Sequence, residues 1–398
     1  MSSKKSLARI VKILSANEFI KNCLRYNLFT HDIEIQERPE WSKFLSPGDI
    51  LDNEALIDIR YYLETVCELE ADSRLVSDAC YILASRNTYH PVKEYIEKEK
   101  WDGIKRLDEW LIHTVGCEDN IYNQLAGKRL LIAAVNRVYN PGCKFDHMMI
   151  LEGPQGIGKS TMIEELAGNF YIDVSFEHKD KDLVDTMRQG MLIEVSELTG
   201  MNKKEIDWLK SFITRKTDVI RLPYAHRSKP FKRNCVFIGT YNPSGNNTYL
   251  NDDTGNRRFW PIECRVINLE YIKENKHQLW AEALECFKAK EPYYIFEEEA
   301  IKIMLDIHAE REIESPTHTR IKEWLKIKFD EVSMTEIIED CLKINMSGKH
   351  PKEMLSLQTT VGIIMKKIGW RKGKNENRNK YFKPGDHKPL ELQESFDE

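Results

Sequence analysis

The chain has 398 residues, of which 41% are hydrophobic and 31% charged, so it is long enough for two or three domains that each bury a core. Its formal net charge of −5 excludes an overall basic field, and any contact with nucleic acid must therefore use a local patch. The nine cysteines contain no Cys-x-x-Cys pair, which favours reduced thiols in a cytosol over a disulfide framework or a zinc site.

Residues 1–100 are predicted to form an N-terminal helical domain. Residues 7–30 and 53–100 have mainly helical periodicity, and Pro91 suits the first turn of a helix that stops near Gly103. The N-terminal segment has amphipathic spacing rather than a signal-peptide core, and no apolar run reaches membrane-spanning length. We therefore expect an unprocessed cytoplasmic protein without a membrane contact.

Residues 101–313 are predicted to form an α/β core. A helical pattern continues to the break at Asn140-Pro141-Gly142, and a second helical stretch covers about 270–312. Between them, short apolar runs alternate with helical segments, which is typical of an α/β unit. These runs, predicted to be buried strands, are 148–152, 191–195, 235–240 and 259–264.

The segment "LEGPQGIGKST" has the spacing Gly153-x-x-x-x-Gly158-Lys159-Ser160 of a phosphate-binding P-loop. Glycines allow backbone N–H groups to surround phosphate oxygens, Lys159 adds positive charge, and Ser160 offers a hydroxyl to Mg²⁺. A glycine-rich turn without a ligand is the alternative, but the predicted strand before it and helix after it favour the P-loop. The predicted ATP-binding residues are Gly153, Pro154, Gln155, Gly156, Ile157, Gly158, Lys159, Ser160 and Thr161.

Polar residues end the next two predicted strands. Glu194 and Glu197 close one apolar run, and we assign Glu194 to Mg²⁺ and Glu197 to the base, although the sequence does not separate these roles. Asn242, after the following run, would orient the attacking water. The alternatives are charged residues that merely cap a strand and an Asn-Pro turn.

Two adjacent arginines, Arg257 and Arg258, precede the last predicted strand. In ring ATPases an arginine at this place projects into the nucleotide of the neighbouring subunit and neutralises charge in the transition state. The alternative is an ion pair with Asp252 or Asp253. Both can hold, with one arginine in each role.

The chain resembles the virulence-associated protein E family, P-loop proteins of phages and mobile elements related to the AAA+ and superfamily 3 helicases. Long ordered motifs over residues 90–265 carry the resemblance, namely "HPVKEYIEKEKWDGIKRLDEWL", "NPGCKFDHMMILEGPQGIGKST", "MLIEVSEL", "DVIRLPYAHRSKPFKRNCVFIGTYN" and "LNDDTGNRRFWPIE".

The resemblance implies an ATPase core that replicates mobile DNA inside a bacterial host, assembled as a homo-oligomer, a hexameric ring. It makes Lys159 and Ser160 the ligands of nucleotide and Mg²⁺, Asn242 the sensor, and one of Arg257 and Arg258 the finger. The spacing Glu-x-x-Glu departs from the adjacent Asp-Glu common in AAA+ proteins and leaves the base open. Because the region before residue 100 has no primase metal motif, priming is not expected.

Two basic segments are predicted to contact DNA. In "RLPYAHRSKPFKR", Arg221, His226, Arg227 and Lys229 would meet the phosphates of a single strand in the ring pore, and Tyr224 would stack on a base. A solvated surface loop is an equally weighted alternative.

The second segment belongs to a winged-helix-like module predicted over residues 317–386. "KKIGWRKGKNENRNKYFK" holds eight Lys/Arg against one Glu, interleaved with Trp370, Tyr381 and Phe382, and is predicted to bind duplex DNA, with helix 357–368 in a groove. A solvated charged face is the alternative, and residues 387–398 are an acidic tail. The predicted contacts are Lys366, Lys367, Arg371, Lys372, Lys374, Arg378 and Lys380.

Together these features predict a helicase-like DNA motor that hydrolyses ATP to ADP and phosphate. One rival is a replication initiator or helicase loader in which ATP only switches DNA affinity. A small-molecule kinase is a third, which would not need the basic C-terminal module.

Overall fold

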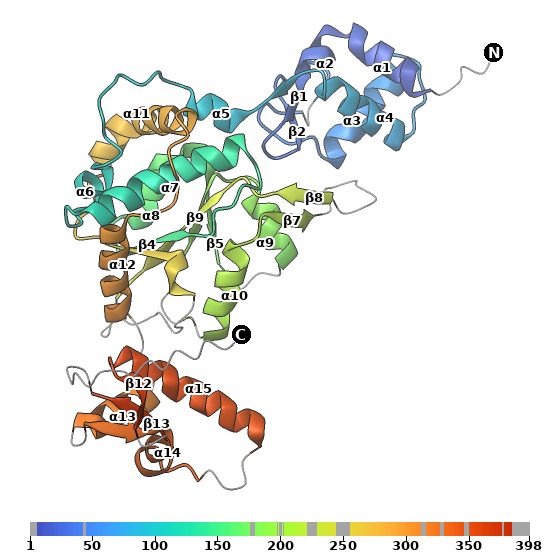
Figure 1. The fold of residues 1–398 in the computed structure, drawn as a ribbon. Helices are drawn as coiled ribbons and strands as arrows, with labels where there is room; N and C mark the ends of the chain where they lie inside the picture. The colour runs from blue at the N-terminus through green and yellow to red at the C-terminus, as the bar shows by residue number, and fades with distance from the viewer. Residues whose placement is uncertain are drawn as a thin grey trace, which may run out of the picture. The chain divides into compact units, whose positions relative to one another are not determined.

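The structure is a computed structural model that describes residues 6–42, 45–175, 180–196, 198, 201, 203–220, 229–243, 255–311, 316–326, 330–345, 350–375 and 378–383. It divides into two compact units, residues 1–311 and 312–398 (Figure 1). Within the first unit, the N-terminal region and the central region have separate hydrophobic cores. The domain boundary expected at residue 100 stays a prediction.

The N-terminal region packs helices against a small three-stranded sheet of order β2-β1-β3. The prediction of mainly helix over residues 7–30 is wrong at its end, because Leu24–Asn27 is a strand. Its Tyr26 pairs with Thr88, a partner distant in sequence that local periodicity does not reveal. The elements are α1 (Leu7–Ala16), α2 (Glu18–Cys23), β1 (Leu24–Asn27), β2 (Ile33–Ile35), α3 (Asn53–Thr65), α4 (Ser73–Ala84) and β3 (Thr88–Tyr89).

The central region is built on a five-stranded parallel sheet of order β10-β4-β9-β6-β5, which confirms the predicted α/β class. Four of its strands lie within one residue of the predicted apolar runs. Strand β5 and the antiparallel hairpin β7–β8 were not predicted. The strands are β4 (Met148–Glu152), β5 (Tyr171–Val174), β6 (Leu192–Val195), β7 (Thr217–Ile220), β8 (Lys229–Lys232), β9 (Val236–Tyr241) and β10 (Phe259–Glu263).

Helices cover both faces of this sheet (Figure 1). Met149 and Leu151 of β4 belong to the core beneath α7, α8, α11 and α12, whereas Met148 and Ile150 belong to the core beneath α9 and α10. This alternation follows from the two-residue period of a strand. The helices are α5 (Pro91–Ile96), α6 (Trp110–Val115), α7 (Ile121–Tyr139), α8 (Lys159–Ala167), α9 (Asp180–Met187), α10 (Lys203–Ile213), α11 (Leu269–Lys288) and α12 (Glu298–Arg311), with the short 3₁₀ turns η1 (Gly168–Phe170) and η2 (Asn256–Arg258).

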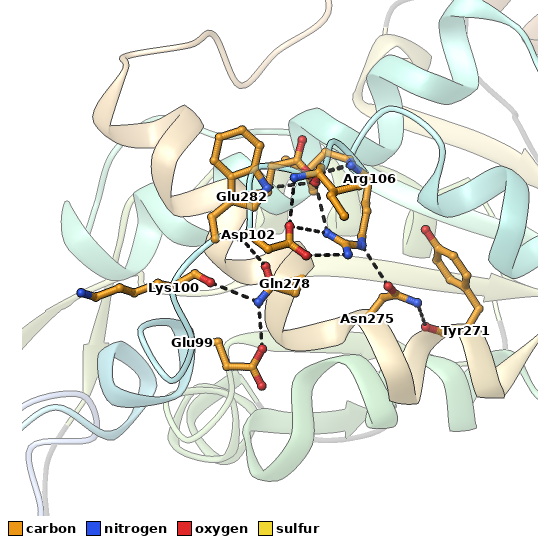
Figure 2. A network of polar contacts seen from close by, with 11 residues as sticks. Glu99, Lys100, Asp102, Arg106, Tyr271, Asn275, Gln278 and Glu282 are labelled. Atoms are coloured by element: carbon orange, nitrogen blue, oxygen red, sulfur yellow. Dashed lines mark hydrogen bonds and ion pairs between the residues drawn. The ribbon is translucent and has the colours of Figure 1, made fainter.

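A polar network fastens the segment between α5 and α6 to α11 (Figure 2). Arg106 donates two hydrogen bonds of 2.8 Å to the carboxylate of Asp102, and the backbone N–H groups of Arg106 and Leu107 donate to buried Glu282. Helix α11 in turn packs on α8, where Trp280 donates to the carbonyl of Leu166. The "WDGIKRLDEW" part of the family motif therefore supports the helix that follows the glycine-rich loop.

The second unit has its own core and a three-stranded antiparallel sheet of order β11-β13-β12. Its long helix ends at Lys367, close to the predicted end near Gly369. The elements are α13 (Pro316–Lys326), β11 (Glu331–Ser333), α14 (Met334–Glu336), the π-helical turn η3 (Ile337–Cys341), α15 (Pro351–Lys367), β12 (Arg371–Asn375) and β13 (Arg378–Phe382).

Two further features concern the described residues as a whole. All nine cysteines are free thiols. Within the described ranges, no helix combines the length and the apolar character that a membrane span requires.

Candidate functional site

The glycine-rich loop of residues 153–158 connects the carboxyl end of β4 to the start of α8. Gly156 and Gly158 have φ angles of +79° and +101°, a left-handed conformation that glycine adopts without strain. Gly153 lies so close to the carbonyl of Cys264 that an added Cβ would stand 2.5 Å from its oxygen. The loop thus turns directly into α8, whose first N–H groups have no intrahelical acceptor and attract an anion.

Lys159, the first residue of α8, turns its side chain back into this loop. Its Nζ donates hydrogen bonds of 2.8 Å to the carbonyls of Gly153 and Pro154 and to Oδ1 of Asn242. The side chain is only 6% exposed, and burial lowers the pKa of its ammonium group. All three acceptors are neutral, so an anionic oxygen at the loop would bind this ammonium more strongly than they do.

Glu194 of β6 is 1% exposed and accepts three hydrogen bonds from hydroxyl groups. Ser160 of α8 and Thr240 of β9 both donate to Oε1 at 2.8 Å, and Tyr171 of β5 donates to Oε2 at 2.5 Å. No described Lys, Arg or His forms an ion pair with this carboxylate. The ammonium of Lys159 attracts this carboxylate through space without forming an ion pair with it. A buried carboxylate whose direct partners are all neutral hydroxyls favours a further cation nearby.

Asn242 follows β9 directly, and β9 is the neighbour of β4 in the sheet. The N–H of Gly153 donates to the carbonyl of Tyr241, which joins the loop to the end of β9. Lys159, Ser160, Glu194 and Asn242 therefore gather at one edge of the sheet, as parallel strands require. Glu197, the predicted base, lies outside the described residues.

Arg257 and Arg258 lie in η2, immediately before β10, at the opposite edge of the sheet. Phe259 pairs with Met148, so the pair stands beside the amino end of β4, and the glycine-rich loop follows its carboxyl end. Arg257 is exposed, and Nε of Arg258 has no hydrogen-bond partner among the described residues. Asp252 and Asp253, the alternative partners, lie outside the described residues.

A second buried carboxylate, which sequence reasoning did not single out, ends β4. Glu152 is 5% exposed, and its two oxygens accept from Nε of Arg311, at the end of α12, at 3.0 and 2.9 Å. The two residues are 159 positions apart in the chain. Their pairing joins the strand before the loop to the last helix of the first unit.

The first basic segment lies mostly outside the described residues, including Arg221, Tyr224, His226 and Arg227. Lys229 is the exposed first residue of β8 and pairs with Ile220, the last residue of β7. The hairpin base is well anchored, because buried Arg233 donates at 2.9 and 2.8 Å to both oxygens of Asp218 in β7.

In the second unit, α15 and the β12–β13 hairpin border a groove of about 1020 Å³, here named the basic groove. Lys366, Arg371 and Lys372 line it, none of its described lining residues is acidic, and these three cations form no ion pair with a described residue. The remaining lining residues are Met334, Gln358, Thr359, Gly362, Gly369, Trp370, Asn379 and Tyr381.

The other predicted contacts of this unit are arranged differently. Lys380 is paired with Glu331, and Lys367 also has a partner. The backbones of Lys374 and Arg378 lie in β12 and β13. Trp370 and Tyr381 are members of the hydrophobic core, so the interleaved aromatics serve first to fold the module.

Sequence reasoning missed two of the three hydroxyls on Glu194. Thr240 carried a weak signal as a polar residue near the end of an apolar run. Tyr171 carried none, because its contact depends on β5 lying beside β6 in the sheet.

The fold of this chain also occurs in known proteins. Two solved structures of the NrS-1 C terminal region, an A form apo structure and an apo structure, match with TM-scores of 0.52 and 0.50. Each is 14% identical, over 95% and 96% of this chain and 99% of each of theirs, and at that identity the likeness concerns the fold alone. No curated protein matches the chain. A family model, the virulence-associated protein E-like domain, matches residues 96–313, more than half of the chain, and the chain therefore belongs to the virulence-associated protein E-like family.

Proposed function

We propose that the chain is an ATP-hydrolysing, helicase-like motor that acts on DNA during replication of a phage or mobile genetic element. The observation that carries this proposal is the meeting of Lys159, Ser160 and Glu194 at the carboxyl edge of the parallel sheet, directly after a loop with P-loop spacing. Membership of the virulence-associated protein E-like family supports the setting in mobile DNA.

The residues at this edge suit ATP and Mg²⁺. The N-terminus of α8 and the ammonium of Lys159 would bind phosphate oxygens, and Ser160 with Glu194 would hold the metal. The fit rests on the donor set, since a hydroxyl and a buried carboxylate joined by a 2.8 Å hydrogen bond are hard oxygen ligands of the kind Mg²⁺ prefers. When bound, Mg²⁺ supplies charge that stabilises the phosphoryl group under attack.

Asn242 and Glu197 would handle the attacking water. Asn242 accepts a hydrogen bond from Lys159 at the loop, and this contact supports our proposal that its amide orients a water beside the terminal phosphate. Glu197, three residues beyond Glu194, is our choice of base. Glu194 would remain the metal-side carboxylate.

Arg257 and Arg258 support a catalytic interface between copies of the chain. A strand of five residues separates the two edges of the sheet, about 16 Å at 3.3 Å per residue, and this separation supports our proposal that the arginines serve the loop of a neighbouring chain. A homo-oligomeric ring would bring them to the nucleotide of a neighbour. We propose a hexamer, as the family resemblance implies.

DNA would be held at two places. The β7–β8 hairpin, with its basic loop, would contact a single strand in the pore. The basic groove of the second unit would hold the phosphates of a duplex, because three cations without ion pairs among the described residues face it without a carboxylate.

The nucleotide site is tested by Lys159→Ala. The variant should keep the melting temperature of the parent and lose ATP turnover, since no other described cation contacts the loop. Lys276→Ala is the matched control. Lys276 lies on α11 and pairs with Glu165 of α8, the helix that begins at Lys159, so this variant removes a lysine beside the same helix and should leave turnover unchanged. Wild-type turnover in Lys159→Ala would contradict the assignment.

The arginines are tested by mixing inactive chains. Alanine at Arg257 or Arg258 should spare ATP binding and lower hydrolysis by roughly 10³-fold, as for arginine fingers. When the arginine variant is mixed with Lys159→Ala, the first supplies an intact loop and the second an intact arginine. Interfaces that combine the two should be active, so hydrolysis should partly return. If subunits exchange and no mixture recovers, the arginines act within their own chain or serve structure.

The DNA role is tested by replacing Lys366, Arg371 and Lys372 together with alanine in the full chain. Duplex affinity should fall. The slope of the logarithm of the binding constant against the logarithm of the salt concentration should become shallower by up to about 3, near 0.9 for each lost phosphate contact. A control variant with alanine at Lys322, Lys326 and Lys352 loses the same charge in the same unit and should retain affinity.

The rival functions differ in what the purified chain does with ATP and DNA. Strand separation driven by ATP supports the motor, whereas ATP-dependent duplex binding without strand separation supports an initiator or loader. A small-molecule kinase would hydrolyse ATP at a rate that DNA does not alter.

A further inference from the structure

The buried carboxylate of Glu194 is held from three different elements. Ser160 of α8 and Thr240 of β9 occupy Oε1, and Tyr171 of β5 alone among the described residues donates to Oε2. Losing Tyr171 would therefore leave one oxygen of a side chain that is 1% exposed without a donor. An unsatisfied buried acceptor costs on the order of a full hydrogen bond and would let the carboxylate rotate.

The sheet register explains how Tyr171 reaches this oxygen. Tyr171 is the first residue of β5 and pairs with Leu192, two residues before Glu194 in β6. Side chains two residues apart share a face of a strand, so Tyr171 and Glu194 lie on the same face of the sheet, together with α8. The length of the tyrosine side chain covers the two residues along the strand that separate Leu192 from Glu194.

The hydroxyl of Tyr171 is placed to hold the carboxylate. It donates to Oε2 of Glu194 at 2.5 Å, on the side of the carboxylate opposite the two hydroxyls that donate to Oε1. Its contribution is to fix the plane of the carboxylate that faces Ser160.

We propose that Tyr171 is a positioning residue that sets the Mg²⁺ requirement of nucleotide binding by orienting Glu194. This role rests on the proposed function, because it assumes that Ser160 and Glu194 hold the metal of a bound nucleotide. Outer partners of metal-site carboxylates matter by roughly 10- to 100-fold in metal affinity. Tyr171 does not touch the loop that binds the phosphates, so its influence should be confined to the metal.

The test measures binding of a fluorescent ADP analogue by the full chain, with EDTA and over a Mg²⁺ titration. Tyr171→Phe keeps the ring and removes the hydroxyl. We expect the half-saturating Mg²⁺ concentration to rise roughly 10-fold or more, while affinity without Mg²⁺ stays that of the parent. The melting temperature should fall by only a few degrees, as the loss of one buried hydrogen bond requires.

Tyr95→Phe is the matched control. Its hydroxyl donates at 3.0 Å to the carbonyl of Leu166 in α8, its ring packs against Phe170, and it does not contact Glu194. This variant removes a half-buried tyrosine hydroxyl beside the same helix and should leave the Mg²⁺ requirement unchanged.

Two outcomes would overturn the proposal. An unchanged Mg²⁺ requirement in Tyr171→Phe, or an equal loss of affinity with and without Mg²⁺, removes the positioning role and leaves the nucleotide site standing. Failure of the unsubstituted chain to bind the analogue at all would remove the proposed function and this role together.

Discussion

Two carboxylates are buried beside the glycine-rich loop, and their partners differ in kind. Glu152, the last residue of β4, meets the guanidinium of Arg311, whereas Glu194, on β6, meets the hydroxyls of Ser160, Thr240 and Tyr171. The two side chains are 5% and 1% exposed, so the cost of taking each charge out of water is similar. Only Glu152 forms a direct ion pair with a described residue, whereas Lys159 acts on Glu194 through space.

This difference separates a structural carboxylate from one that suits a ligand. A guanidinium that covers both oxygens satisfies the charge and leaves little for another cation to gain. Hydroxyls orient a carboxylate but leave its charge, which then attracts a metal ion. Exposure alone would not distinguish the two residues, and their partners do.

Of the variants that test this difference between Glu152 and Glu194, the one expected to have the largest effect removes the cation that pairs with Glu152. Arg311→Met keeps the stem of the side chain and leaves a buried carboxylate without its positive partner, which should lower the free energy of unfolding by about 3–5 kcal/mol. Urea unfolding followed by circular dichroism measures the change.

Two further variants test that reading of Arg311. Arg265→Met breaks the exposed pair with Glu263, the last residue of β10, and should leave stability almost unchanged because solvent screens an exposed ion pair. Glu152→Met combined with Arg311→Met removes both charges and should recover most of the loss. Equal effects of Arg311→Met and Arg265→Met would contradict a structural role for the buried pair.

Much of this arrangement could be predicted from the sequence because buried parallel strands form continuous apolar runs. The runs that became β4, β6, β9 and β10 were found within one residue. Edge strand β5, with the polar Asp173 in "YIDV", and the "KPFK" strand β8 are short and partly exposed, so no apolar run marked them.

The candidate site divides in the same way. Lys159, Ser160 and Asn242 each follow a recognisable strand and Glu194 lies near the end of another, and the shared edge of a parallel sheet brings them together. The contacts of Tyr171 with Glu194 and of Arg311 with Glu152 depend instead on which strands and helices become neighbours. That order is a property of the tertiary fold, and local patterns do not contain it.

The next effect concerns Glu194 and should appear in activity rather than in stability. Glu194→Gln keeps the shape but removes the charge that would hold Mg²⁺, so ATP hydrolysis per folded molecule should fall by roughly 10²-fold, equivalent to about 3 kcal/mol. Phosphate release and a melting curve measure the two properties. Loss of stability without loss of hydrolysis would place Glu194 in the same class as Glu152.

Glu197→Gln serves as its companion variant. We expect this chain to bind ATP with Mg²⁺ as the parent does and to hydrolyse it slowly, as removal of a base requires. If Glu194→Gln shows that behaviour and Glu197→Gln loses metal-dependent binding, the two glutamates have exchanged roles.

The smallest expected effect lies on α12, the helix that supplies Arg311. His308, one turn earlier, is 6% exposed, and its Nε2 lies 2.9 Å from the carbonyl oxygen of Phe259 at the start of β10. Burial lowers the pKa of His308 below its ordinary value of 6.5; the Phe259 carbonyl opposes this shift, and the nearby cations Arg311 and Lys210 add to it. The folded chain therefore holds this ring neutral, as a donor to Phe259.

The sign of the pH dependence follows from that lowered pKa. As pH falls below about 6.5, the unfolded chain takes up the proton first, so stability that is present above this pH is lost as pH falls through the folded pKa. His308→Gln keeps an N–H donor for Phe259 but does not titrate, so its melting temperature should fall less than that of the parent between pH 7.5 and pH 5. Comparing the two chains cancels the other histidines. If the melting temperatures of the two chains fall in parallel with pH, the packing of α12 against β10 does not depend on a neutral His308. The ion pair of Arg311 with Glu152 would then hold α12 in place whether or not His308 is charged.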